Sequence, residues 1–132
     1  CPLVVAIIGL VGHALGDALF YGSVWWSWVI PEAVVGIAIG VFAKKFEVRE
    51  GGFNGKKIVL FNIVQVVANA VAWILVAPVL DILVYSEPAN KVFLQGVFAW
   101  LGDVIIIGIL GSLLLVAYSK IAGKSGSLTK ED

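Results

Sequence analysis

The sequence predicts an all-α protein, a polytopic bundle of about four transmembrane helices, and three observations carry this prediction. Hydrophobic residues fill 61% of the 132 positions, whereas soluble domains hold about 45–50%. Charged residues make up only 14%, and the mean hydropathy is +1.04. The charges also fall between long apolar segments, as expected where a hydrocarbon core excludes them. These features argue against a soluble globular enzyme.

Four apolar segments are long enough to cross a bilayer core, which takes roughly 20 residues at about 1.5 Å each. The first two cover residues 3–20 and 24–43. The other two, 58–85 and 92–121, exceed the required length, so they should tilt, break or project beyond the core. Pro78 should kink or end its helix. We interpret residues 1–132 as a single transmembrane domain that is N-terminally truncated, because the apolar sequence begins at once with Cys1 in place of Met.

The basic residues predict the orientation. Five of the nine lie between Lys44 and Lys57, and three more lie at or after the end of the last segment. By the positive-inside rule, residues 44–57 and the C-terminal tail should be cytoplasmic. The joints near residues 21–23 and 86–91 should then face outward. Aromatic rings prefer the membrane interface, so we expect at the outer interface Tyr21, Trp25, Trp26 and Trp28.

Ionisable residues within the apolar segments are the first candidates for function. Asp17, Glu32, Asp81 and Asp103 would each cost about 2.5–3.5 kcal/mol at mid-membrane. They either touch interfacial water or line a polar cavity. His13 and Asp17 are four residues apart and share a helix face, so they form either a proton relay or ligand contact, or a structural hydrogen bond.

Amides and glycines form further patterns. A stripe on the third segment either joins helices or contacts a ligand, and it comprises Asn62, Gln65, Asn69 and Trp73. Gln95 and Asp103 are eight residues apart, roughly on one face of the fourth segment. Glycines let neighbouring helices approach closely and mark packing faces, either within the bundle or against another subunit; the candidates are Gly9, Gly12, Gly16, Gly36, Gly40, Gly108 and Gly111.

Several classes of chemistry lack the residues they need. One cysteine and one histidine provide neither an internal disulfide nor a zinc cage, so we expect no metal and no cofactor. No basic patch favours nucleic acid. Gly123-Lys124-Ser125 resembles the end of a phosphate-binding loop, but Tyr118 stands where the upstream glycine belongs. No arrangement typical of nucleophilic catalysis is present.

Three stretches carry a family resemblance: GLVGHALGDALFYGSVWWSWV, FNIVQVVANAVAWILVAPVLDILVYSEPANKVF and KSGSLTKED. They resemble an uncharacterised bacterial membrane family that is grouped with the S components of energy-coupling-factor (ECF) transporters, of the riboflavin-type class. The resemblance implies a six-helix bundle in the bacterial cell membrane, of which this chain supplies helices 3 to 6. The first two helices, with the small-residue motif that docks on the coupling protein, are missing from the pattern.

The resemblance also implies a function. An S component captures a vitamin or similar small heterocyclic compound from outside and works with one transmembrane coupling protein and two ATPases, so this chain should be a transport subunit and not an enzyme. Two alternatives stay open: a stand-alone proton-coupled secondary transporter and a ligand-free structural subunit. Substrate should bind in the outer half, among Asp17, Tyr21, Trp25, Trp26, Asn69, Trp73, Asp81, Asn90, Gln95 and Asp103.

Overall fold

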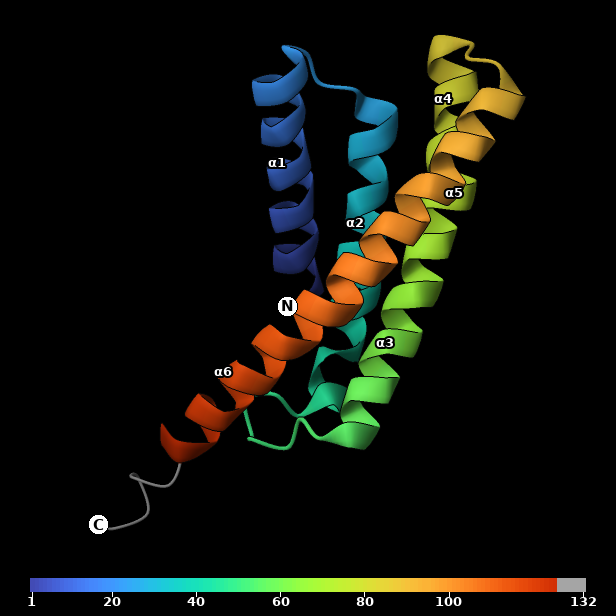
Figure 1. Cartoon of the computed structure of the whole chain (residues 1–132). Coiled ribbons are helices and arrows are strands. Elements are labelled where there is room, and N and C mark those ends of the chain that lie inside the picture. Colours follow the sequence, from blue (N-terminus) through green and yellow to red (C-terminus); the bar gives the residue numbers. More distant parts are fainter. Residues whose placement is uncertain (126–132) are drawn as a thin grey trace.

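The computed structural model describes residues 1–125; the last part of the tail, which includes Lys130, lies outside the described residues. Every regular element described is a helix (Figure 1), which confirms the predicted all-α bundle. Four of these helical stretches are long and apolar enough to cross a membrane, judged by length and composition, and they cover Pro2–Tyr21, Trp26–Phe46, Gly55–Tyr85 and Ala89–Gly123.

The first two helices form a tight hairpin. Helix α1 (Pro2–Tyr21) ends at Gly22, whose φ of 74° allows the chain to turn, and α2 (Trp26–Phe42) follows. A Cβ added at Gly36 would lie 2.6 Å from Ala6 Cα, and one added at Gly40 would meet Pro2 Cα. The two glycines therefore form the close packing face expected from their spacing.

Two glycines of α1 have no close neighbour among the described residues. A Cβ added at Gly12 or Gly16 would meet no atom of the described residues within 4 Å, whereas one at Gly9 would meet Glu32 at 3.3 Å. Among the described elements, α1 packs almost entirely against α2, and these two positions face open space instead of a helix. In Figure 1, α1 stands beside α2 and apart from α5.

A short 3₁₀ helix, η1 (Ala43–Phe46), leads to the third stretch, which runs through α3 (Gly55–Asn69), η2 (Ala70–Val76) and α4 (Ala77–Tyr85). Pro78 does not end this helix. It stands near the start of α4, directly after the π-helical η2. A proline lacks a backbone donor and crowds the preceding turn, so the helix should be irregular there. The irregularity is a wider, π-helical turn before Pro78.

The fourth stretch also contains a π-helical turn and runs through α5 (Ala89–Ile106), η3 (Ile107–Gly111) and α6 (Ser112–Ser125). Reciprocal hydrogen bonds join it to the third stretch. Trp100 Nε1 donates to the carbonyl of Val66 at 3.2 Å, and Gln65 Nε2 donates to the carbonyl of Val104 at 3.3 Å. Each accepting carbonyl lies within four residues of the start of a π-helical turn, so side-chain donors from the neighbouring helix support both irregular turns.

Two cores hold the bundle. One core contains Trp28, Val35, Ala72, Trp73 and Ala77. The other contains Phe46, Phe53 and Phe61. The Phe61 ring meets the rings of Phe46 and Phe53 edge to face, with centroids 5.6 and 6.1 Å away respectively. Figure 1 shows the joint between α1 and α2 and the joint between α4 and α5 at the same end of the molecule, with the basic segment 44–57 at the opposite end. The placement of these ends relative to the cytoplasm stays a prediction.

Candidate functional site

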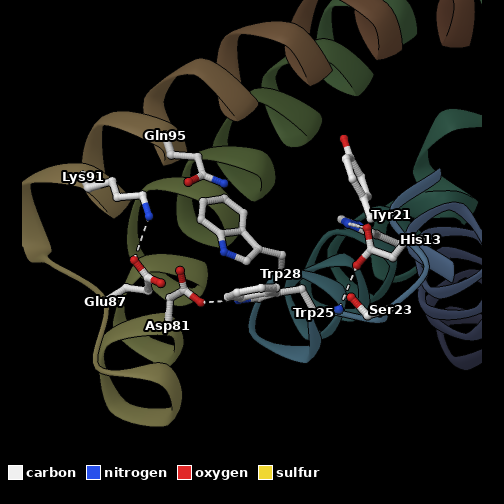
Figure 2. Close-up of a pocket in the computed structure, with 10 residues that line it drawn as sticks. His13, Tyr21, Ser23, Trp25, Trp28, Asp81, Glu87, Lys91 and Gln95 are labelled. Carbon is white, nitrogen blue, oxygen red and sulfur yellow. Dashed lines mark hydrogen bonds and ion pairs between the residues drawn. The ribbon is translucent and has the colours of Figure 1, made fainter.

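A cavity of about 590 Å³ lies at the end of the bundle where the two short joints meet (Figure 2). Ligand pockets typically measure about 300–1,000 Å³. Its walls combine aromatic rings with charged and polar groups from four helices and both joints. The lining consists of His13, Asp17, Tyr21, Ser23, Trp25, Trp28, Asp81, Glu87, Lys91 and Gln95.

A second, more open hollow of about 490 Å³ adjoins the cavity. The two share four lining residues, His13, Asp17, Tyr21 and Trp28. From these the second hollow continues along the face of α1 that carries Gly9, Gly12 and Gly16. It reaches Glu32 on α2, Trp73 on η2 and Asp103 on α5. The two hollows therefore form one continuous polar and aromatic region.

Trp25 ties together the helices around the cavity. Its backbone N–H donates to Asp17 Oδ2 on α1 at 3.0 Å, and its indole Nε1 donates to Asp81 Oδ1 on α4 at 2.7 Å. Its ring centroid lies 4.9 Å from that of Tyr85. Ser27 Oγ donates to the same oxygen of Asp81 at 2.5 Å. A single residue in the first joint thus bridges α1 and α4 through two carboxylates, as the dashed lines in Figure 2 show.

His13 stands between two carboxylates and against an aromatic wall. Its Nε2 lies 3.6 Å from Asp17 Oδ1, and its Nδ1 lies 3.5 Å from Glu32 Oε1. Its ring centroid is 5.8 Å from that of Trp73, which stacks on Trp28 at 6.0 Å. The spacing of four residues predicted that His13 and Asp17 lie together, and the distance of 3.6 Å confirms it. Glu32 comes from another helix, and no local signal in the sequence could have paired it with His13.

Most of the residues predicted to bind substrate meet in this region. Asp17, Tyr21, Trp25, Asp81 and Gln95 line the cavity. Trp73 and Asp103 line the adjoining hollow. The convergence follows from the short joints, which bring the ends of all four long helices together.

Three predicted residues do not line either hollow. Trp26 is 55% exposed on the surface of the bundle, away from both hollows, because consecutive residues of a helix point about 100° apart. Asn90 is exposed near the start of α5. Asn69 is fully buried; its Nδ2 donates to the carbonyl of Gln65 at 2.8 Å, and its Oδ1 accepts from Trp73 Nε1 at 3.0 Å. The structure thus places Asn69 behind Trp73, as a support for that ring.

The predicted site also omitted several lining residues. Trp28 was assigned only to an interfacial belt, yet it is 8% exposed and part of the core. Glu87 and Lys91 form an ion pair at 2.8 Å on the cavity wall, and their spacing of four residues was a usable signal. Within the described residues, no group of three or more His, Cys, Asp or Glu side chains is placed to hold a metal ion.

A bundle of apolar helices with a polar, aromatic cavity at one end is typical of membrane proteins that bind a small molecule. The chain belongs to the family described as ECF-type riboflavin transporter, S component, whose sequence profile matches residues 1–120. Membership makes it a multi-pass membrane protein and a substrate-binding transport subunit.

Curated relatives support this assignment, and the three described next are each named as a UPF0397 protein. One from Exiguobacterium sp. is 52% identical over 130 residues, which cover 98% of this chain and 71% of the relative. One from Lactobacillus helveticus is 53% identical over 125 residues, covering 95% and 68%. One from Clostridium perfringens is 51% identical over 130 residues, covering 98% and 70%. No solved structure matches the chain.

Proposed function

We propose that the chain captures a vitamin or a similarly small heterocyclic compound in the cavity between its two short joints, as the S component of an ECF-type importer. The observation that carries the proposal is the cavity itself, with the indoles of Trp25 and Trp28 beside the carboxylate of Asp81 and the amide of Gln95. Indole faces stack on flat rings, and a few polar groups on an aromatic wall fix orientation.

Gln95 adds support for a ligand. Its side chain is exposed and makes no hydrogen bond to the described residues, although it lines the cavity. In Figure 2 it lies beside the Trp28 ring. An amide in this position is free to bond a ring nitrogen or a carbonyl of a heterocycle.

The energy for uptake would come from partners. We propose that a transmembrane coupling protein and two ATPases complete the importer, with residues 44–57 and the C-terminal tail in the cytoplasm. The cavity then opens outward, because it lies at the end of the bundle opposite residues 44–57. The family to which the chain belongs supports this arrangement, and the charge distribution agrees with it.

Ligand retention tests the proposal. Small molecules that co-purify with the full-length protein are released and identified by mass spectrometry, for the wild type and for two adjacent substitutions. Trp25→Ala should lose the ligand, because Trp25 lines the cavity. Trp26→Ala should keep it, because Trp26 lines neither hollow. Equal retention of the ligand by both variants would contradict the proposal. So would retention by Trp25→Ala with loss in Trp26→Ala, because Trp26 lies outside the cavity.

One observation favours a second candidate, a proton-coupled secondary transporter. His13 lies 3.6 Å from Asp17 and 3.5 Å from Glu32, beside the cavity, and such a cluster suits proton transfer. Vesicles that contain only the full-length protein and ligand separate the two. Concentrative uptake driven by a proton gradient would favour the second candidate, whereas uptake that requires the partner ATPases supports the first.

A further inference from the structure

We infer that the ligand of this cavity carries a positive charge, an ammonium group or a cationic ring nitrogen, which binds against the carboxylate of Asp81. This inference rests on the proposed binding function and adds the chemical class of the substrate. Three observations carry it: the balance of charge around the two hollows, the surroundings of Asp81, and the aromatic rings beside it.

The hollows hold more carboxylates than cations. Five carboxylates line them, from Asp17, Glu32, Asp81, Glu87 and Asp103, but only Lys91 and His13 can carry positive charge there. Both cations already have partners. Lys91 Nζ lies 2.8 Å from Glu87 Oε2, and His13 is shared between Asp17 and Glu32. Asp81 and Asp103 form no ion pair with any described residue.

Asp81 is the more sequestered of these two. It is 3% exposed, and its Oδ1 accepts from two neutral donors, Trp25 Nε1 at 2.7 Å and Ser27 Oγ at 2.5 Å. Its Oδ2 has no hydrogen-bond partner among the described residues, and Asp81 lines the cavity. A carboxylate removed from water needs an opposite charge or further donors to offset its desolvation. The unoccupied oxygen provides the place for a ligand's cationic group.

The aromatic walls suit the same group. The indole of Trp25 is held to Asp81 through its own N–H, so the ring stands next to the carboxylate, and Trp28 lines the same cavity. A cation over an indole face is attracted by the ring's quadrupole. A cation at Asp81 Oδ2 therefore meets a full negative charge in a cavity that two indole rings also line. A neutral ligand would leave the carboxylate without an ion-pair partner, and an anionic ligand would be repelled.

A matched series of probes tests the charge directly. Aminomethylquinoline, hydroxymethylquinoline and quinoline carboxylate, with the substituent on the same ring carbon, share one ring and differ in charge at neutral pH. Riboflavin serves as a second neutral probe. Binding to the full-length protein in detergent is measured by tryptophan fluorescence. We expect aminomethylquinoline to bind about tenfold or more tightly than the neutral probes.

Two variants locate the effect. Asp81→Asn keeps an oxygen that accepts from Trp25 and Ser27 but loses the charge, so it should remove the preference for aminomethylquinoline. Glu50→Gln is the control, because Glu50 is an exposed carboxylate near the opposite end of the bundle and should leave the preference unchanged. If Asp81→Asn does not fold, the wild type gives a second readout: the affinity for aminomethylquinoline should fall as salt increases.

Each outcome decides the inference. Equal or tighter binding of hydroxymethylquinoline or riboflavin overturns it, as does a cation preference that survives in Asp81→Asn. If a neutral probe binds as tightly as aminomethylquinoline and its binding is lost in Trp25→Ala, the charge inference fails while the proposed function stands. Absence of binding by every probe at millimolar concentration, in folded protein, overturns the charge inference, and co-purification then decides the proposed function separately.

Discussion

Replacing Trp25 with phenylalanine tests the bridge across the cavity. The change removes the indole N–H that donates to Asp81 Oδ1 at 2.7 Å. It keeps an aromatic ring near Tyr85 and the backbone N–H that donates to Asp17 at 3.0 Å. The substitution therefore isolates one hydrogen bond that joins the α1–α2 hairpin to α4.

The size of the effect can be reasoned from the surroundings. A hydrogen bond to a charged group contributes about 1.5–3 kcal/mol. Trp25 is 41% exposed, so solvent can replace part of the lost bond. Ser27 also still donates to the same oxygen. We therefore expect Trp25→Phe to lower the free energy of unfolding by about 1–2 kcal/mol.

Unfolding of the full-length protein in mixed micelles, by titration with a denaturing detergent, measures this change. Trp26→Phe is the matched control, because the neighbouring side chain is 55% exposed and makes no hydrogen bond to the described residues. A double-mutant cycle of Trp25→Phe with Asp81→Asn should give a coupling free energy of about 1 kcal/mol. If Trp25→Phe and Trp26→Phe have equal stability and the cycle shows no coupling, the bridge does not hold the helices together.

Three further predictions follow from other parts of the molecule. Gly36→Ala should destabilise the protein by about 1–3 kcal/mol, because the added methyl group would meet the backbone of α1, which cannot rotate away. Gly102→Ala, where nothing described lies within 4 Å, is the control in the same denaturation measurement, and equal stability of the two variants would refute the close packing. Asn69→Ala should weaken ligand binding only indirectly, through a freed Trp73 ring, and should lower the free energy of unfolding by about 1–3 kcal/mol because it removes the acceptor at 3.0 Å from the buried indole N–H. Lost binding with unchanged stability would instead make Asn69 a direct contact of the ligand. Single cysteines at Asn54 and Ala89 of a variant without Cys1 should differ in intact cells, with an impermeant reagent labelling only the cysteine at Ala89; the opposite pattern would reverse the orientation.

Hydropathy made the fold predictable, because the exclusion of charge from long apolar runs depends on composition and not on tertiary contacts. The packing of α1 on α2 at Gly36 and Gly40 was also readable, since a spacing of four places both glycines on one helix face. The convergence of Asp17 and Asp81 followed from topology alone, because both lie near the same pair of short joints.

Other features depend on contacts between helices that no local pattern encodes. Both amides at Asn62 and Asn69 lie on the same predicted stripe, yet Asn62 bonds across to Ser112 at 2.9 Å while Asn69 bonds within its own helix. Which neighbour each of these amides meets depends on the crossing of the helices, since both lie in α3, before the wider turn of η2. The buried position of Trp28, two residues from the exposed Trp26, was not predicted for a related reason. A cluster of Trp residues in the sequence indicates an interfacial belt unless the facing helix is known.

The most direct test of the account is an experimental structure of the full-length protein with its co-purified ligand bound. The account predicts the ligand in the cavity between the two short joints, in contact with Trp25 and Trp28 and with its polar atoms toward Asp81 and Gln95. A ligand bound at the end of the bundle near residues 44–57, or a cavity filled by side chains in the ligand-bound protein, would contradict it.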